Sequence, residues 1–114
     1  MASHPSLRSL QKSLGDRYRI CSIDLEQCLY RDFGNGFNVE ISGVSNPRTK
    51  NPATLYLWFG DTSPDCLIVK TVRDVGRSAE EIGAAVERLY ALTEELIASG
   101  CANRHALWKL KGKA

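Results

Sequence analysis

The chain of 114 residues lacks several features that would assign it to a functional class at once. It has no apolar run near the roughly 20 residues that a helix needs to cross a bilayer. Residues 1–14 lack the unbroken apolar stretch and the cleavage-like end of a signal peptide. No GxGxxG, GxxxxGK or CxxC pattern occurs. We therefore expect one cytoplasmic domain over residues 1–114, with mobile termini at 1–5 and 109–114 and with no membrane association, cofactor or metal.

The charge has no strong sign either. Fifteen Lys and Arg residues against thirteen Asp and Glu residues leave a formal charge of +2. This balance argues against a function that depends mainly on neutralising phosphates. The four cysteines lie far apart in the sequence, three of them in apolar stretches, so we expect reduced thiols that act as small hydrophobic side chains. They are Cys21, Cys28, Cys66 and Cys101.

Residues suited to catalysis are few and scattered. The two histidines lie near opposite ends of the chain, so a histidine-based site would have to recruit a terminus. The carboxylate pairs lie at expected turns or on the solvent side of a hairpin, where acids are usually solvated. These residues are His4 and His105, Asp24 with Glu26, and Asp32 with Glu40. Cys101 and His105 have the spacing of half a zinc site, but no second pair complements them. The sequence therefore favours a protein without a catalytic or metal site.

Capping signals predict two helices. Ser6 precedes three leucines at helical spacing, and Gly15 ends this short helix. Ser78 and Glu81 have the spacing of a capping box, and an apolar stripe follows from Ala79 to Ser99. Residues 102–110 are expected to add a further helical turn.

Between the helices, alternating and β-branched stretches separated by turn residues predict five strands. The ranges are Tyr18–Ile23, Cys28–Phe33, Phe37–Ser42, Thr54–Phe59 and Cys66–Val72. The predicted fold is α+β: an antiparallel five-stranded meander sheet with a short N-terminal helix and a long C-terminal helix packed on one face.

The glycine and asparagine residues at 34–36 predict a tight hairpin turn, but they leave its register open. A two-residue loop would place Arg31 opposite Glu40, as a charge pair. A three-residue loop would instead pair Phe33 with Phe37, and it would shift every pair by one residue.

The fourth predicted strand is apolar on both faces, with Leu55 and Leu57 on one and Tyr56 and Trp58 on the other. If the leucines face the long helix, the aromatic residues lie on the opposite sheet face, either exposed or covered by the first helix or the tail. An exposed aromatic face is typical of a protein interface. The sequence thus favours a non-catalytic protein-interaction module, such as an adaptor, a regulatory subunit or an inhibitor, including those that phages and mobile elements encode. The predicted partner-binding residues are Tyr56, Trp58, Tyr30 and Arg31.

The alternative function is nucleic-acid binding through a basic loop and basic termini. Its predicted residues are Arg48, Lys50, Arg17 and Arg19, and its distinguishing property would be a steep salt dependence. The oligomeric state stays open between monomer and homodimer, since an edge strand at Tyr18–Ile23 or Cys66–Val72 offers a pairing surface.

Overall fold

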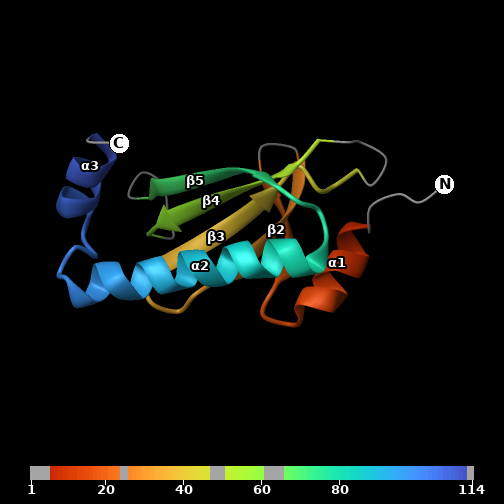
Figure 1. Cartoon of the computed structure of the whole chain (residues 1–114), viewed down its shortest axis with the longest axis horizontal. Helices are drawn as coiled ribbons and strands as arrows, with labels where there is room; N and C mark the ends of the chain where they lie inside the picture. Colours follow the sequence, from red (N-terminus) through yellow and green to blue (C-terminus); the bar gives the residue numbers. More distant parts are fainter. Residues whose placement is uncertain (1–5, 24–25, 47–50, 61–65, 113–114) are drawn as a thin grey trace.

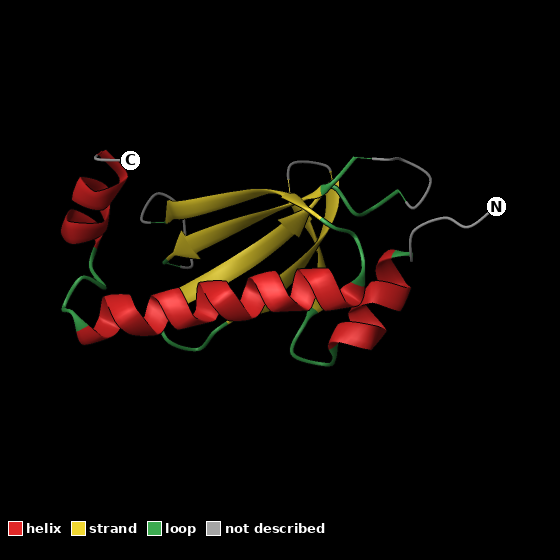
Figure 2. Ribbon diagram, viewed as in Figure 1, coloured by secondary structure: helices red, strands yellow, loops and turns green. Residues whose placement is uncertain are grey.

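A computed structural model describes residues 6–23, 26–46, 51–60 and 66–112. The predicted fold class is confirmed: one antiparallel sheet of five strands is flanked by a short N-terminal helix and a long helix near the C-terminus (Figure 1, Figure 2). The elements are α1 (Leu7–Leu14), β1 (Arg19–Ile23), β2 (Glu26–Asp32), β3 (Phe37–Ser42), β4 (Ala53–Phe59), β5 (Leu67–Val75), α2 (Ala79–Ala98) and α3 (Arg104–Gly112).

The sheet order is β1-β2-β3-β4-β5, so each strand pairs with its neighbours in sequence and β1 and β5 form the two edges. The hairpin between β2 and β3 has the three-residue loop. The Phe33 amide donates to the Phe37 carbonyl over 3.0 Å, and Asn35 Oδ1 accepts from the Phe37 amide over 3.1 Å. Arg31 therefore lies opposite Val39, and its pairing with Glu40, which the two-residue loop required, does not occur.

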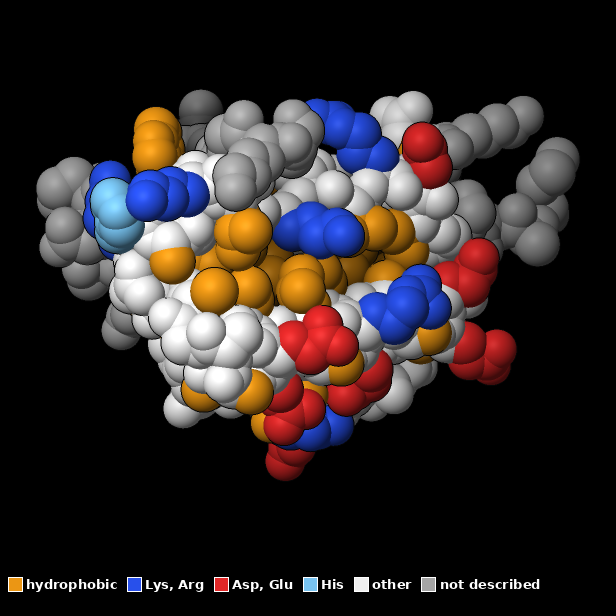
Figure 3. Space-filling model, turned by 60° about the vertical axis from the view of Figure 1, so that its left-hand side comes forward, with side chains coloured by type: hydrophobic (Ala, Val, Ile, Leu, Met, Phe, Trp, Pro, Cys, Tyr) orange, Lys and Arg blue, Asp and Glu red, His pale blue; other side chains and the backbone are white. Residues whose placement is uncertain are grey.

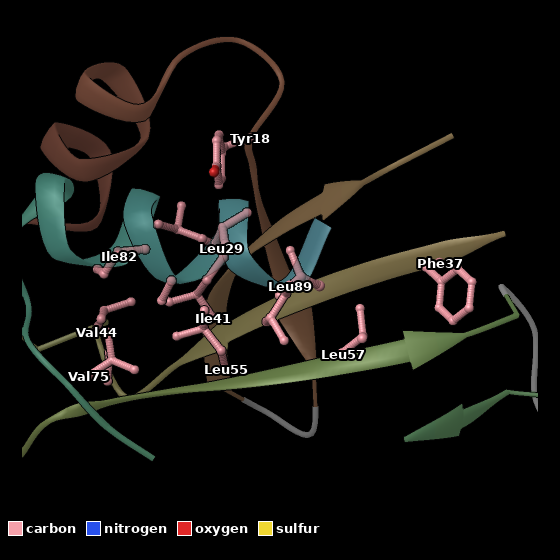
Figure 4. Close-up of a cluster of buried hydrophobic side chains, with 14 of the residues drawn as sticks. Tyr18, Leu29, Phe37, Ile41, Val44, Leu55, Leu57, Val75, Ile82 and Leu89 are labelled. Carbon is pink, nitrogen blue, oxygen red and sulfur yellow. The ribbon is translucent and has the colours of Figure 1, made fainter. Parts of the chain in front are cut away.

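One face of the sheet forms the hydrophobic core with α2. Leu29, Ile41, Leu55 and Leu57 are fully buried and lie on the helix side of their strands, where Figure 4 shows them between the sheet and α2. The apolar stripe of α2 covers them. The leucines of the fourth strand thus face the long helix, where aliphatic side chains bury most area against the helix stripe.

Both predicted caps form. Ser6 accepts from the Ser9 amide over 3.2 Å, and Gly15 ends α1 with a φ of +111°. At the start of α2, Ser78 Oγ accepts from the Glu81 amide over 3.1 Å and donates to the Glu81 carboxylate over 2.9 Å. The Ser78 hydroxyl thus satisfies the Glu81 amide, which has no partner within the helix.

Two strands differ from their predicted bounds by more than one residue at one end. β5 extends three residues beyond Val72, because Val75 joins the core opposite Ala53. Asp74 takes a φ of +59°, which asparagine and aspartate tolerate better than most residues, next to a register shift in the pairing with β4. β2 begins two residues earlier than predicted, since Glu26 pairs with Ile23.

The helix α3 completes one end of the molecule. It runs to Gly112, two residues past the predicted end, and it contacts β5 (Figure 1). Leu107 is fully buried in the core, whereas Trp108 is 61% exposed. The chain thus folds back after α2 and places α3 beside the edge strand β5.

Candidate binding surfaces

The outer face of the sheet, opposite α2, carries the predicted aromatic residues. Tyr30, Tyr56 and Trp58 are half-buried there, between the fully exposed and fully covered alternatives. Glu40 lies between Tyr30 and Tyr56 in the register, is only 8% exposed, and accepts a 3.2 Å hydrogen bond from Trp58 Nε1. The buried carboxylate therefore accepts a hydrogen bond from an aromatic residue of the same face.

Two further contacts tie this outer face together. Asn38, also buried, donates to the carbonyl of Gly60 over 3.0 Å. The guanidinium carbon of Arg19 lies 4.7 Å from the centre of the Tyr30 ring, a cation–π distance. Polar groups and rings on this face thus meet partners within the same layer.

The structure separates Arg31 from the other three predicted interface residues. It projects from the helix side of β2, is 5% exposed, and donates from Nη1 to Glu87 over 2.8 Å. Its guanidinium also contacts the rings of Tyr18, Phe33 and Tyr90, at 5.1 to 5.8 Å from their centres. The one-residue register change explains this placement, because it moves a side chain to the opposite face. Arg31 joins the sheet to α2 and is not part of the outer face.

The electrostatics of Arg31 agree with that role. Burial by itself lowers the pKa of the guanidinium, but the hydrogen bonds to Glu87 and Tyr18 outweigh it and raise that pKa above its ordinary value. The charge is therefore kept under the helix.

Cys28 lies on the outer face, 1% exposed, directly opposite Cys21, whose carbonyl accepts from its thiol over 3.6 Å. Burial first, and then the Glu40 carboxylate, raise the pKa of the Cys28 thiol to about 12. This thiol is protonated at neutral pH and is a poor nucleophile. All four cysteines are free thiols in the structure.

The predicted nucleic-acid residues are only partly visible. Arg17 and Arg19 are exposed near the start of β1. Arg48 and Lys50 lie outside the described residues.

A second buried arginine escaped sequence analysis. Arg77, at 3% exposure, donates to the Asn46 carbonyl over 2.8 Å and to the Asn51 carbonyl over 3.4 Å. It therefore joins the two described ends of the β3–β4 connection to the segment that leads into α2. A buried cation that donates to main-chain carbonyls holds those backbone segments in place, and its donors are not directed at a ligand.

A groove lies elsewhere, between β5, α2 and α3. We call it the β5–α2 groove. One part has a volume of about 470 Å³ and an adjoining part about 260 Å³, and both are lined by Lys70 and Leu92. Figure 3 shows apolar side chains gathered around a basic side chain on this side of the molecule. The first part is completed by Ile68, Val69, Thr71, Leu96 and Leu110, and the second by Val72, Ala85, Arg88 and Leu89.

Sequence analysis missed this groove, although one signal pointed to it. Leu89, Leu92 and Leu96 form one apolar stripe on α2, of which Leu92 is only half-buried, and β5 is the last strand of a meander. A wide stripe beside an edge strand leaves apolar surface uncovered.

The described part of the chain has no recognisable metal site. No group of three or more histidine, cysteine or acidic residues is placed there to hold a metal ion. None of the described helices combines the length and the hydropathy that a bilayer span requires. Comparisons of the chain with models of protein families, with curated proteins and with solved structures found no match.

Proposed function

We propose that this protein is a small protein-recognition module that binds an extended segment of a partner protein in the β5–α2 groove. The observation that carries the proposal is the juxtaposition of an edge strand and an apolar groove. β5 pairs only with β4 among the described strands, so its outer edge presents main-chain donors and acceptors. Adding a strand to such an edge is a recurrent mode of peptide recognition, in which the groove beside it selects side chains.

The lining of the groove supports this mode. Leu92 and Val69 are partly buried against the core, and Leu110 on α3 is 46% exposed at the rim. An opening of a few hundred Å³ with mainly apolar walls is typical of binding sites, because a ligand that fills it removes apolar surface from water.

The outer sheet face is the other surface on which a partner is expected. Its aromatic residues, Tyr30, Tyr56 and Trp58, are half-buried and keep some apolar area at the surface. The groove is favoured over it because polar groups of the outer face have partners in the same layer, as Trp58 has in Glu40. Burying the outer face against a partner would therefore gain less binding free energy than filling the groove.

The test compares four forms of the tagged full-length protein as baits in lysate of its own source, with and without nuclease. They are the original protein, Leu92→Glu in the groove, Ala91→Glu as a matched control, and Trp58→Ala on the outer face. Ala91 is exposed and precedes Leu92, so both glutamates add the same charge to α2. Circular dichroism first confirms that each variant folds.

Each outcome decides between the surfaces. We expect a protein that the original and the Ala91→Glu bait retain and the Leu92→Glu bait loses. A protein lost only with Trp58→Ala would overturn the groove and place the interface on the outer face. Retention that disappears with nuclease and falls steeply with salt would favour nucleic-acid binding instead.

A further inference from the structure

The two parts of the β5–α2 groove lie on either side of one charged residue. Lys70 lies opposite Leu57 in the β4–β5 register, on the side of the sheet that faces α2, yet it is exposed. Val69 lines one part of the groove and Val72 the other, so the strand offers an apolar residue on each side of the lysine.

The charges that line the groove are positive. Lys70 and Arg88 are the charged lining residues, and neither forms a hydrogen bond or an ion pair with another residue that the structure describes. The nearest acids along the same helix face, Glu81 and Glu95, are each seven residues from Arg88, about 10 Å along the axis. Two unpaired cations in an apolar groove are complementary to a negative group.

A second copy of the chain fits this edge poorly. Two β5 strands paired edge to edge would bring two copies of Lys70 into one small region between apolar walls, and like charges there repel each other. A lysine on the inward side of an edge strand is a recognised device against such pairing. The same lysine would be neutralised by a partner that carries an acid.

We propose, resting on the function proposed above, that the partner segment is an extended peptide with one acidic residue between two apolar ones, each two positions away. In a strand, side chains two residues apart lie on the same face and about 6.7 Å apart. The acidic side chain binds Lys70, with Arg88 nearby, and the two apolar side chains enter the two parts of the groove. The main chain of the segment pairs with the outer edge of β5.

The experiment is a selection from displayed random peptides of about nine residues, the length of one strand. The baits are the original protein, Lys70→Glu, Leu92→Glu and the control Ala91→Glu. We expect the original and Ala91→Glu to enrich peptides with Asp or Glu flanked at both second positions by apolar residues. The Lys70→Glu bait should instead enrich Lys or Arg at the central position.

An enriched peptide is then synthesised with a fluorophore, together with a version in which lysine replaces its acid. Fluorescence anisotropy should show at least about tenfold weaker binding for the lysine version, since the substitution removes a hydrogen bond between opposite charges and brings like charges together. Nitrogen-15 spectra should show that amides of β5 shift and that their hydrogens exchange more slowly when the peptide is bound.

The outcomes distinguish this proposal from the function beneath it. Peptides that depend on Leu92 but show no acidic preference would overturn the charge rule and leave groove recognition standing. Peptides that bind Leu92→Glu as well as the original, or no enriched peptides at all, would overturn both. Association of the protein with itself that Leu92→Glu abolishes would replace the acidic partner by a second copy.

Discussion

The outer sheet face and the β5–α2 groove both leave apolar side chains near water, but they differ in what those side chains do. On the outer face, Trp58 donates to a buried Glu40 and Tyr30 lies beneath Arg19, so these two rings have a polar or cationic neighbour in the same layer. In the groove, leucines and valines border an opening that contains no partner for Lys70 among the described residues. Half-buried aromatic residues on a sheet face therefore do not by themselves indicate a binding site.

The largest effect should separate the two faces of β4. Leu57→Ala removes a fully buried side chain under α2, so we expect the free energy of unfolding to fall by about 2–5 kcal/mol. Tyr56→Ala, one residue away on the outer face, should cost about 1 kcal/mol. Urea unfolding followed by circular dichroism measures both. Equal losses would mean that the outer face is as much a core as the inner one.

A smaller effect tests whether the outer face holds its own polar groups. Glu40→Ala leaves the indole N–H of Trp58 without this acceptor, so unfolding should become easier by about 1–3 kcal/mol. Glu40→Gln keeps an oxygen acceptor and should lose less. A Trp108→Phe background makes tryptophan fluorescence report on Trp58 alone. If the alanine variant were as stable as the original, the network would not contribute to stability.

Cys28 tests how well the outer face excludes water. Because its thiol pKa is raised to about 12, its contribution to stability is complete below pH 9, where the thiol of the unfolded chain titrates, and is lost as the pH rises toward 12. Between these values the unfolded state binds fewer protons, so stability should fall more steeply than in Cys28→Ala. Iodoacetamide at neutral pH should label Cys28 only after urea is added, as read by mass spectrometry. Rapid labelling of the folded protein would show that water reaches this face.

The smallest expected change in stability lies in the groove. Leu110 is 46% exposed at its rim, so Leu110→Glu should alter the free energy of unfolding by no more than about 0.5 kcal/mol. The same change places a negative charge beside the apolar wall and should weaken binding of the selected acidic peptide. A large loss of stability would mean that the groove wall belongs to the core, and the contrast with the outer face would disappear.

The sequence could predict the elements and their order because each depends on local signals. Alternation in residues 54–59 separates the leucines from the aromatic residues, and Ser78 with Glu81 marks the start of α2. The hairpin register could not be predicted from the sequence, since both loop lengths give plausible residue pairs. That uncertainty of one residue left open which of the neighbours Tyr30 and Arg31 shares a face with Tyr56, and in the structure it is Tyr30.

The groove could not be predicted because it depends on how elements meet. Its walls require that β5 is an edge and that α2 and α3 both lie beside that edge. No short stretch of sequence encodes that arrangement. Leu110 and Lys70 have no common local pattern, and only tertiary packing brings them to one opening.

The buried Arg31 has a consequence for how the protein folds. The meander pairs neighbouring strands and forms from contacts that are close in sequence, whereas Glu87 lies 56 residues from Arg31. Until α2 docks, water solvates the guanidinium. If α2 docked one turn out of place, it would bury that charge without its carboxylate, at a cost of several kcal/mol. Arg31 thus disfavours helix positions that leave its guanidinium unpaired and favours the one in which Glu87 reaches it.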